Sequence, residues 1–335
     1  MNTKGYLSTA AFVLAIALSG AGCASPAGPE TQSTPEGPVV AWFNCTGYTV
    51  DLYFPRCDSL VSNAYTTGEV PSDILSHEDG RIAVLNSLDC TVQVFAVDST
   101  GSQLFSVQLP SGSNPYHMSW DGNSLWVTLL LTSEVARVDM EQGGTVTLFD
   151  TPPNPTSIAA DGGFVFVGHG NWPDPSVTGG ISVLDASTGD LTDSIATPDN
   201  VCFMEYFSST GNLHAVTCTY TGDGRISVID PLTMGISTQI YTGGSPGRPT
   251  ETPSGFAAGD GWSSGSIYLY GESGTLETWN TGMATSAGVA CIGDTLYVTD
   301  PLSDLVIMAD IQERTLLDTL PAGSSGPQGI RSLQR

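Results

Sequence analysis

Short apolar runs separated by turns rich in Gly, Pro, Asn and Asp recur along the chain from about residue 39 onwards. The most apolar runs read "RIAVLN", "SLWVTL", "FVFVGH", "LHAVTC", "SIYLYG" and "TLYVTD". Each is followed by a polar turn and then by a run such as "EVARVD" or "GISVLD". Runs of this length with turns between them predict antiparallel strands.

These strands belong to a repeated unit. The unit opens with Pro or Gly and a short apolar strand, passes through a Gly-containing turn into the apolar run, and ends its third strand on an Asp or Asn. The closing residues recur about every 42 residues and are Asp98, Asp139, Asp185, Asp230, Asn280 and Asp310. Four strands in about 42 residues is the size of one β-propeller blade. We expect the closing side chains to accept backbone N–H groups of the next turn.

Six units fill residues 71–326, and two fragments remain. Residues 39–70 contain "VVAWFN", "TVDLYF" and "SNAYTTG", which are typical of second, third and fourth strands. The C-terminal "PQGIRSL" is typical of a first strand. The sequence therefore predicts an all-β fold over residues 39–335, a seven-bladed β-propeller with four antiparallel strands per blade. Its ring closes by pairing the C-terminal strand with the N-terminal strands, which removes open sheet edges.

The repeated units resemble the YVTN and NHL-type repeat propellers, and "LYVTD" at 296–300 is one residue from the Tyr-Val-Thr-Asn signature. The resemblance covers about residues 71–326 and implies a fold without implying an activity. "DGNSLWVTLLLTSEVARVD" also resembles streptogramin-lyase-type propellers. That family uses paired histidines, a Glu-X-His arrangement and magnesium, whereas this chain has no Glu-X-His and only four histidines. The resemblance therefore implies the scaffold and not the catalytic residues.

The first 22 residues have the pattern of a signal peptide. Lys4 precedes the apolar "AAFVLAIALSGAG", which is too short to span a bilayer comfortably. "LSGAGC" resembles a bacterial lipoprotein signal, in which Cys23 becomes the lipidated first residue of the mature chain, although that family prefers Leu where this chain has Gly20. Residues 23–38 are rich in Pro, Gly, Ser and Thr and predict a flexible tether. We therefore expect an exported protein, lipid-anchored at the cell envelope or cell surface.

Charge excludes one class of partner. Without residues 1–22 the chain has no lysine and keeps eight Arg against 34 Asp and Glu. A surface this acidic argues against binding nucleic acid, and against any membrane contact other than the lipid anchor.

Six cysteines remain after Cys23, which in an exported protein favours disulfides. "VCFMEYF" and "LHAVTC" flank the turn "SSTGN" and predict a hairpin. Pairing Phe207 with Leu213 in this hairpin places Cys202 opposite Cys218, within reach of a disulfide.

The other four cysteines leave alternatives open. We favour the pairs Cys45–Cys90 and Cys57–Cys291. The alternative, Cys45–Cys57, requires residues 44–57 to form a loop. No Cys-X-X-Cys occurs, so the sequence offers no metal site built on clustered cysteines and indicates no cofactor.

Candidate chemistry gathers at one mouth of the central channel, where first strands begin and second strands end. By this interpretation Tyr116, Trp172 and Arg248 are candidate ligand-binding residues, with Arg248 on the inserted loop "TGGSPGRPTETPSG". His117, His169 and Glu205 are candidates for a metal site or an acid/base pair.

These observations favour a monomeric binding or scaffold module for a protein or glycan partner at the cell envelope. The alternative is a metal-dependent lyase or hydrolase, streptogramin-lyase-like or lactonase-like, with its site at the channel mouth. A lactonase needs a calcium cradle near the axis, and Asp121, Asn123 and Asp161 are expected in turns at the far ends of first strands. An enzymatic role is therefore the less favoured prediction.

Overall fold

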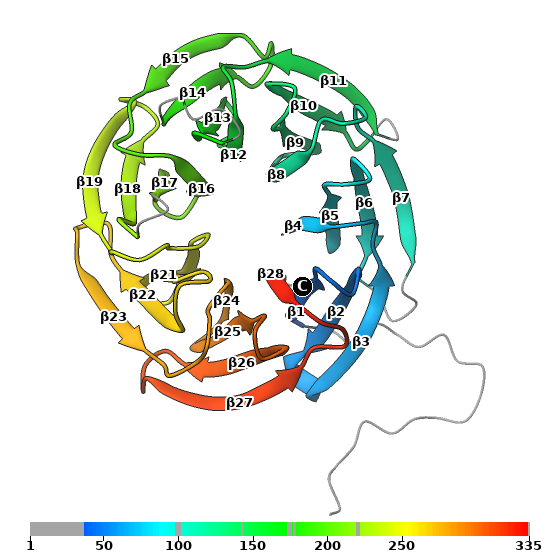
Figure 1. Cartoon of the computed structure of the whole chain (residues 1–335), viewed down its shortest axis with the longest axis vertical. Coiled ribbons are helices and arrows are strands. Elements are labelled where there is room, and N and C mark those ends of the chain that lie inside the picture. Colours follow the sequence, from blue (N-terminus) through cyan, green and yellow to red (C-terminus); the bar gives the residue numbers. More distant parts are fainter. Residues whose placement is uncertain are drawn as a thin grey trace, which may run out of the picture. The chain divides into compact units, whose positions relative to one another are not determined.

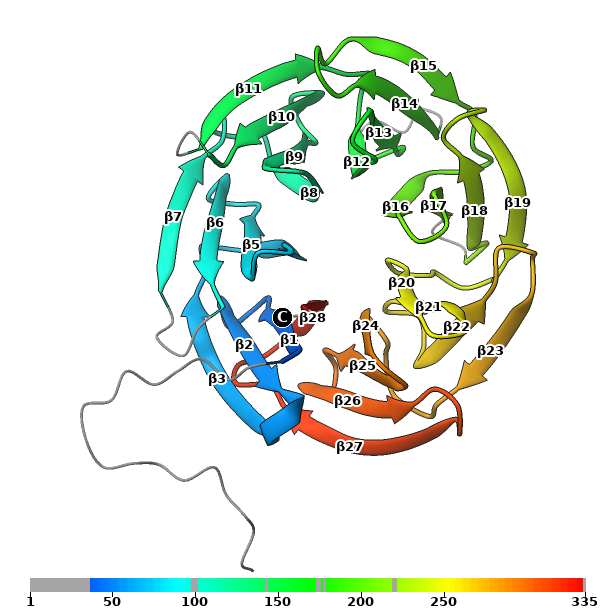
Figure 2. The same ribbon diagram turned by 180° about the vertical axis from the view of Figure 1, so that it is seen from behind.

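Seven four-stranded antiparallel sheets stand around a central axis in the computed structural model (Figures 1 and 2). The structure describes residues 37–97, 102–141, 144–172, 176, 179–218 and 222–333. Each sheet is one blade, with its first strand at the channel and its fourth strand at the outer rim. The chain is thus an all-β, seven-bladed propeller, as the repeat predicts.

Six blades are continuous in sequence. Their strands are β4 (Pro71–Ser76), β5 (Arg81–Asn86), β6 (Thr91–Ala96) and β7 (Gln103–Gln108); β8 (Pro115–Asp121), β9 (Ser124–Leu129), β10 (Glu134–Asp139) and β11 (Thr145–Asp150); β12 (Pro155–Ala160), β13 (Phe164–His169), β14 (Gly180–Asp185) and β15 (Leu191–Ile195); β16 (Val201–Phe207), β17 (Asn212–Thr217), β18 (Arg225–Asp230) and β19 (Gly235–Tyr241); β20 (Thr250–Thr252), β21 (Gly255–Gly259), β22 (Ser266–Tyr270) and β23 (Leu276–Asn280); and β24 (Gly288–Ile292), β25 (Thr295–Asp300), β26 (Leu305–Asp310) and β27 (Thr315–Pro321).

The seventh blade joins the two ends of the chain, which confirms the predicted closure. Its order is β28 (Pro327–Leu333), β1 (Val39–Asn44), β2 (Thr49–Phe54) and β3 (Ser59–Thr66). β28 pairs antiparallel with β1, with Ile330 opposite Trp42. A hydrogen bond also fixes the connection before β28 to this blade, since the Gly323 N–H donates to Asp51 Oδ2 at 2.7 Å.

The core lies between blades. The second strands are almost wholly buried, since both of their faces pack against neighbouring sheets, whereas outer strands such as β15 and β27 are mostly exposed. This explains the continuous apolar runs of the second strands. The one short helix among the described residues is a 3-10 turn at Pro55–Cys57, and in that part of the chain no helix has the length and apolar character needed to cross a membrane.

The residues that close the third strands behave as predicted. Their side-chain oxygens accept backbone N–H groups two residues further on, for example Ser187 N–H to Asp185 Oδ1 at 2.9 Å and Gln312 N–H to Asp310 Oδ1 at 2.8 Å. Asp139, Asp230 and Asn280 accept in the same way. Asp98 lies outside the described residues.

The predicted Cys202–Cys218 disulfide is present, with Cα atoms 6.6 Å apart, but the predicted register of its hairpin is wrong. Leu213 pairs with Tyr206 and not with Phe207. The strand β16 also carries a bulge at Cys202, because Val201 pairs with Thr217 and Phe203 with Val216. The bulge, which the alternating pattern did not show, brings the two cysteines within bonding distance.

The structure does not contain the other predicted pairs, and the four cysteines are free thiols. Cys90 is buried in the core between the β4–β7 and β8–β11 blades, whereas Cys45 packs in the preceding core, so the β4–β7 sheet separates them. Cys57 packs in the same core as Cys45, and Cys291 lies between the β20–β23 and β24–β27 blades. The alternative Cys45–Cys57 pair fails because the full length of β2 separates the two thiols.

Ring closure predicts a specific loss of stability. Ile330 is 1% exposed and packs with Trp42 and Tyr297 between the closing blade and its neighbour. We expect Ile330→Ala to lower the free energy of unfolding by about 2–4 kcal/mol, because it leaves a cavity in this core. Leu317→Ala, at a half-exposed site on β27, is the matched control and should change stability by less than about 0.5 kcal/mol. Equal effects of the two substitutions in urea denaturation would contradict the assigned role of β28.

Candidate functional site at the channel mouth

The first strands of several blades begin with a β-bulge, often next to a proline. Register shifts follow Pro71 in β4, Pro115 in β8 and Pro155 in β12, and β16 and β28 are irregular in the same place. A bulge adds a residue to one strand and redirects nearby side chains. Here the residues in and beside the bulges line one mouth of the channel, among them Ser72, Tyr116 and Cys202.

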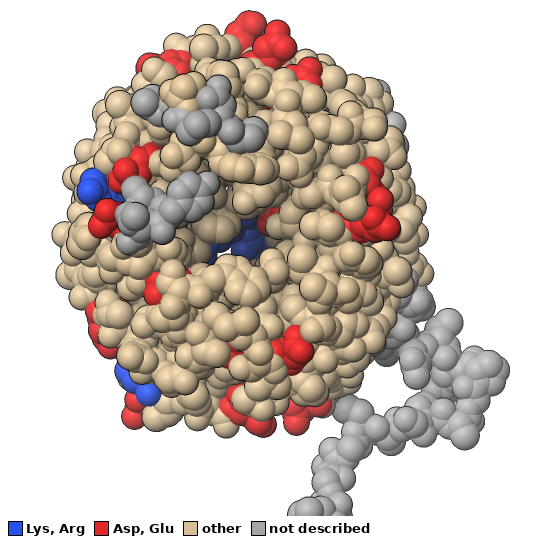
Figure 3. Space-filling model, viewed as in Figure 1, with Lys and Arg blue, Asp and Glu red and all other residues tan. Residues whose placement is uncertain are grey.

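The mouth opens into a cavity of about 780 Å³ to which all seven blades contribute. Three aromatic side chains at this mouth are strongly exposed, namely Tyr116 (38%), Trp172 (50%) and Trp262 (56%). Figure 3 shows that uncharged residues surround most of the central opening, while acidic residues lie mainly further out. On the face that Figure 3 shows, acidic side chains are therefore sparse around the mouth.

Two arginines and two carboxylates form a charge-balanced floor in this channel. Arg248 Nη2 donates to Asp73 Oδ2 at 2.9 Å, and both side chains are less than a tenth exposed. Asp73 also accepts the backbone N–H groups of Met118 and Ile74. Glu205 Oε2 lies 3.5 Å from Arg331 and 3.9 Å from Arg248. Figure 3 shows cationic atoms at the bottom of the opening.

His117 lies beside this floor as a buried, neutral imidazole. Its ring stacks on Phe203 with centroids 5.0 Å apart and contacts Tyr116 at 4.8 Å. Burial lowers its pKa to about 3, and the Arg248 guanidinium acts in the same direction. Its Nδ1 has no hydrogen-bond partner among the described residues. A ring with this pKa is a poor general base near neutral pH.

His169 does not lie with His117 at the floor of the mouth. It is buried at the end of β13, where its Nδ1 lies 3.0 Å from the Pro153 carbonyl and its Nε2 lies 2.8 Å from Ser182 Oγ. Burial lowers its pKa as well. The predicted combination of His117, His169 and Glu205 is therefore not assembled, and no three His, Cys, Asp or Glu side chains of the described residues are grouped to hold a metal ion.

Of the predicted binding residues, Tyr116, Trp172 and Arg248 all line the mouth. Arg248 comes from a segment predicted as one long loop, of which residues 250–252 instead form β20. Sequence reasoning missed Asp73, Arg331 and Trp262. A signal existed for Asp73, since it stands two residues after its leading proline, as His117 does.

The remaining histidines connect blades. His214 is fully buried on β17, and its two ring nitrogens contact the Tyr270 hydroxyl at 2.9 Å and Glu272 Oε1 at 3.0 Å in the next blade. His77 lies 3.1 Å from the Gly122 carbonyl and packs on Trp120 of the following blade. These contacts give both histidines structural roles.

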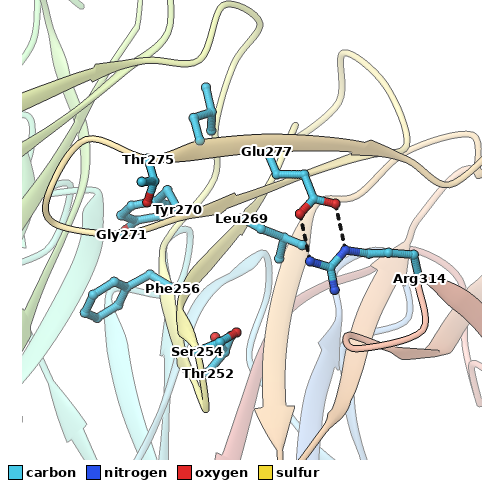
Figure 4. A pocket seen from close by; sticks show the side chains of 10 residues that line it. Thr252, Ser254, Phe256, Leu269, Tyr270, Gly271, Thr275, Glu277 and Arg314 are labelled. Carbon is cyan, nitrogen blue, oxygen red and sulfur yellow. Dashed lines mark hydrogen bonds and ion pairs between the residues drawn. The ribbon is translucent and has the colours of Figure 1, made fainter.

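A second, smaller pocket of about 240 Å³ lies at the β20–β23 blade, away from the mouth (Figure 4). Arg314 reaches it from the turn before β27 and forms a bidentate ion pair with Glu277, with both N–O distances 2.8 Å. The Arg314 guanidinium thus makes two hydrogen bonds to one carboxylate, whereas that of Arg331 makes one hydrogen bond within the described part of the chain.

Comparison with known proteins shows a similarity of fold alone. No protein-family model matches the chain, and no curated protein matches its sequence. Among solved structures, a functionally unknown protein from Desulfotomaculum acetoxidans aligns with a TM-score of 0.71 at 11% identity, covering 89% of this chain and 99% of that one. Virginiamycin B lyase from Staphylococcus aureus aligns with a TM-score of 0.64 at 14% identity over 77% and 87%. A chain of the nidogen/laminin complex aligns with a TM-score of 0.53 at 14% identity over 88% and 98%.

The buried histidines predict how stability depends on pH. The pKa of His117 is about 3 in the folded chain against about 6.5 when unfolded, so the unfolded chain binds more protons between these values. The free energy of unfolding should therefore fall as pH is lowered from about 6.5 towards 3, by up to about 1.4 kcal/mol per pH unit for this histidine.

His117→Phe removes this titration and can keep the stack on Phe203, so urea denaturation between pH 7 and about 4 should show a shallower slope than wild type. His169 and His214, whose pKa values are also lowered, should retain part of the slope. An unchanged slope in His117→Phe would show that His117 is not buried and neutral.

Proposed function

We propose that the protein is an exported, lipid-anchored propeller that binds a partner protein at the cell envelope through its mouth face. The observation that carries the proposal is a ring of exposed apolar residues, which we name the crown. In six blades the turn between the second and third strands presents one large apolar side chain that is 39–65% exposed. The crown comprises Tyr48, Leu88, Leu131, Trp172, Trp262 and Leu302.

The crown belongs to the face that bears the mouth. Several of these turns line the cavity, including Ser87 beside Leu88 and Leu130 beside Leu131. In the β16–β19 blade the equivalent turn includes residues 219–221, which lie outside the described residues. Single exposed apolar residues are common, but their recurrence at one position in blade after blade supports an interaction surface around the mouth.

The opposite face lacks such a pattern. Turns between first and second strands emerge there, because adjacent antiparallel strands reverse direction. They read "HEDG", "GN", "DGG", "SSTG", "PS" and "GD", with no large apolar residue. Leu232, 92% exposed in a turn between third and fourth strands, is an isolated exception. Among the turns of the described residues, exposed large apolar side chains therefore recur on the mouth face, while others such as Leu104, Leu191 and Leu316 lie on the outer strands.

The attachment of the N-terminus supports a partner other than the anchoring membrane. β1 runs towards the mouth face, so Gly37, which precedes it beside Arg56, lies at the opposite face. A tether leading from Gly37 to a lipidated Cys23 would let the crown face away from the membrane. Export and lipidation rest on the N-terminal sequence pattern.

The structural neighbours fit this proposal by analogy only. The same fold occurs in a nidogen/laminin complex and in a mitotic checkpoint complex, both of which are protein assemblies, as well as in virginiamycin B lyase. A binding role is favoured over lyase or hydrolase chemistry because His117 and His169 have separate environments and His117 is held neutral.

The test compares two sets of surface leucines. The variant Leu88→Ser, Leu131→Ser, Leu302→Ser removes three crown positions, and Leu232→Ser on the opposite face is the matched control. After crosslinking in the native cell and purification, we expect a specific envelope protein with wild type and with Leu232→Ser. The crown variant should lose about tenfold or more of this crosslinked protein, because it removes the hydrophobic free energy of burying three leucine side chains in the interface.

All three substitutions are exposed, so the thermal unfolding midpoints should match that of wild type. Recovery of the same partner by the crown variant, recovery of none by wild type, or crosslinking only to a second copy of the chain would each overturn the proposal.

A further inference from the structure

The floor of the mouth has more hydrogen-bonding groups than the protein satisfies. A guanidinium has five N–H donors. Arg248 makes one hydrogen bond, to Asp73, and Arg331 makes one, to the Ile330 carbonyl at 3.2 Å, among the described residues. Within the described part of the chain, the side chain of Glu205 pairs with these two arginines. Donors and acceptors therefore both remain available beside a cavity of about 780 Å³.

Leaving such groups unsatisfied is costly in a buried site. The Arg248 side chain is 9% exposed and that of Arg331 is 18% exposed. Burial lowers the pKa of Arg331, and the neighbouring Arg248 lowers it further. Buried charges are tolerated when they are paired and fully hydrogen-bonded. The remaining donors of these two guanidiniums face the cavity, where oxygen atoms of a ligand can accept from them.

The charge balance of the floor indicates whether the ligand is charged or neutral. Arg248 and Arg331 are matched by Asp73 and Glu205, and His117 is neutral, so the floor carries almost no net charge. An anionic ligand would add an uncompensated charge here and would also be repelled by a chain with a formal charge of −25. A neutral ligand adds no charge to the floor and is not repelled by the acidic chain. Hydroxyl groups suit this floor, because each hydroxyl both donates and accepts hydrogen bonds.

The walls of the cavity offer apolar contacts to the same ligand. Tyr116, Trp172 and Trp262 expose large ring surfaces at the mouth, and the half-buried Phe203 lines the cavity. Aromatic faces pack well against rigid, flat ligands, and their polar atoms stay near water at the rim. A sugar ring has both features, with a C–H face that packs on an aromatic ring and hydroxyls around its edge.

We propose that the channel mouth is a binding site for a neutral saccharide, whose hydroxyls bond to Arg331, Arg248 and Glu205 while its rings pack on the aromatic rim. This site shares Trp172 and Trp262 with the crown but includes none of the crown leucines, and it does not depend on the partner protein. A docked partner would lie over it, since the crown surrounds the same mouth.

The first test is calorimetric titration of the mature chain with neutral gluco-, manno- and galacto-hexasaccharides and with a hexameric oligouronate. We expect one neutral hexasaccharide to bind with little dependence on salt, because no net charge is neutralised. Tighter binding of the oligouronate with strong salt dependence would overturn the proposal in favour of an anion site. Absence of binding by every hexasaccharide would also overturn it.

Variants then locate the site. Arg331→Gln and Trp262→Ala should each weaken binding about tenfold or more, by loss of hydrogen bonds and of a stacking surface. Arg314→Gln, at the lateral pocket of Figure 4, is the matched arginine control and should bind like wild type. Trp262 is 56% exposed, so its variant stays informative even when Arg331→Gln does not fold. Wild-type affinity in Trp262→Ala would overturn the assignment.

The two proposals fail separately. The crown leucine variant should bind the hexasaccharide as wild type does, and Arg331→Gln should retain the crosslinked envelope protein. Loss of sugar binding in the crown variant would show that the two surfaces are one site.

Discussion

The pairing of β28 with β1 is the constraint on which the rest of the structure depends. Every second strand is buried on both faces by neighbouring blades, so an open ring would expose apolar faces and two sheet edges to solvent. The last strand of the chain prevents this by joining residues at opposite ends of the sequence, such as Trp42 and Ile330. The same pairing turns Arg331 towards the channel, so closure also completes the floor of the mouth.

The ring brings together charges that are far apart in sequence. Asp73 and Arg248 are separated by 175 residues, and yet they form a bonded, nearly buried pair. Such a pair is weak grounds for stability, because desolvation offsets most of the attraction between the charges. Here two of the eight arginines of the chain line the channel, while 34 acidic residues dominate its charge. That distribution is better explained by recognition than by a need for stability.

The period of the apolar pattern made the architecture predictable, including the blade shared between the termini. The prediction of the architecture succeeded because packing between blades buries every second and third strand in the same way. The mouth was less predictable, since bulges at Pro71, Pro115 and Cys202 change which side chains face the axis. A bulge has no signature in a two-residue alternation, which is why the hairpin register at Leu213 was wrong although its disulfide was right. His169 was misplaced for a related reason: ending a second strand near the mouth does not turn a side chain into it.

The mouth face has apolar residues at its surface and charged, hydrogen-bonding residues deeper in the channel. At the surface, the crown residues can be covered by any complementary apolar surface, so they favour contact with limited chemical selectivity. At the floor, Arg248 is fixed by Asp73, which is itself held by two backbone N–H groups, so the direction of its free donors is set before a ligand arrives. Donors held in place in this way lower the ordering cost of binding and raise selectivity. Under the two proposals, the crown leucines provide adhesion to the partner protein, and the polar floor together with Trp172 and Trp262 provides discrimination between ligands.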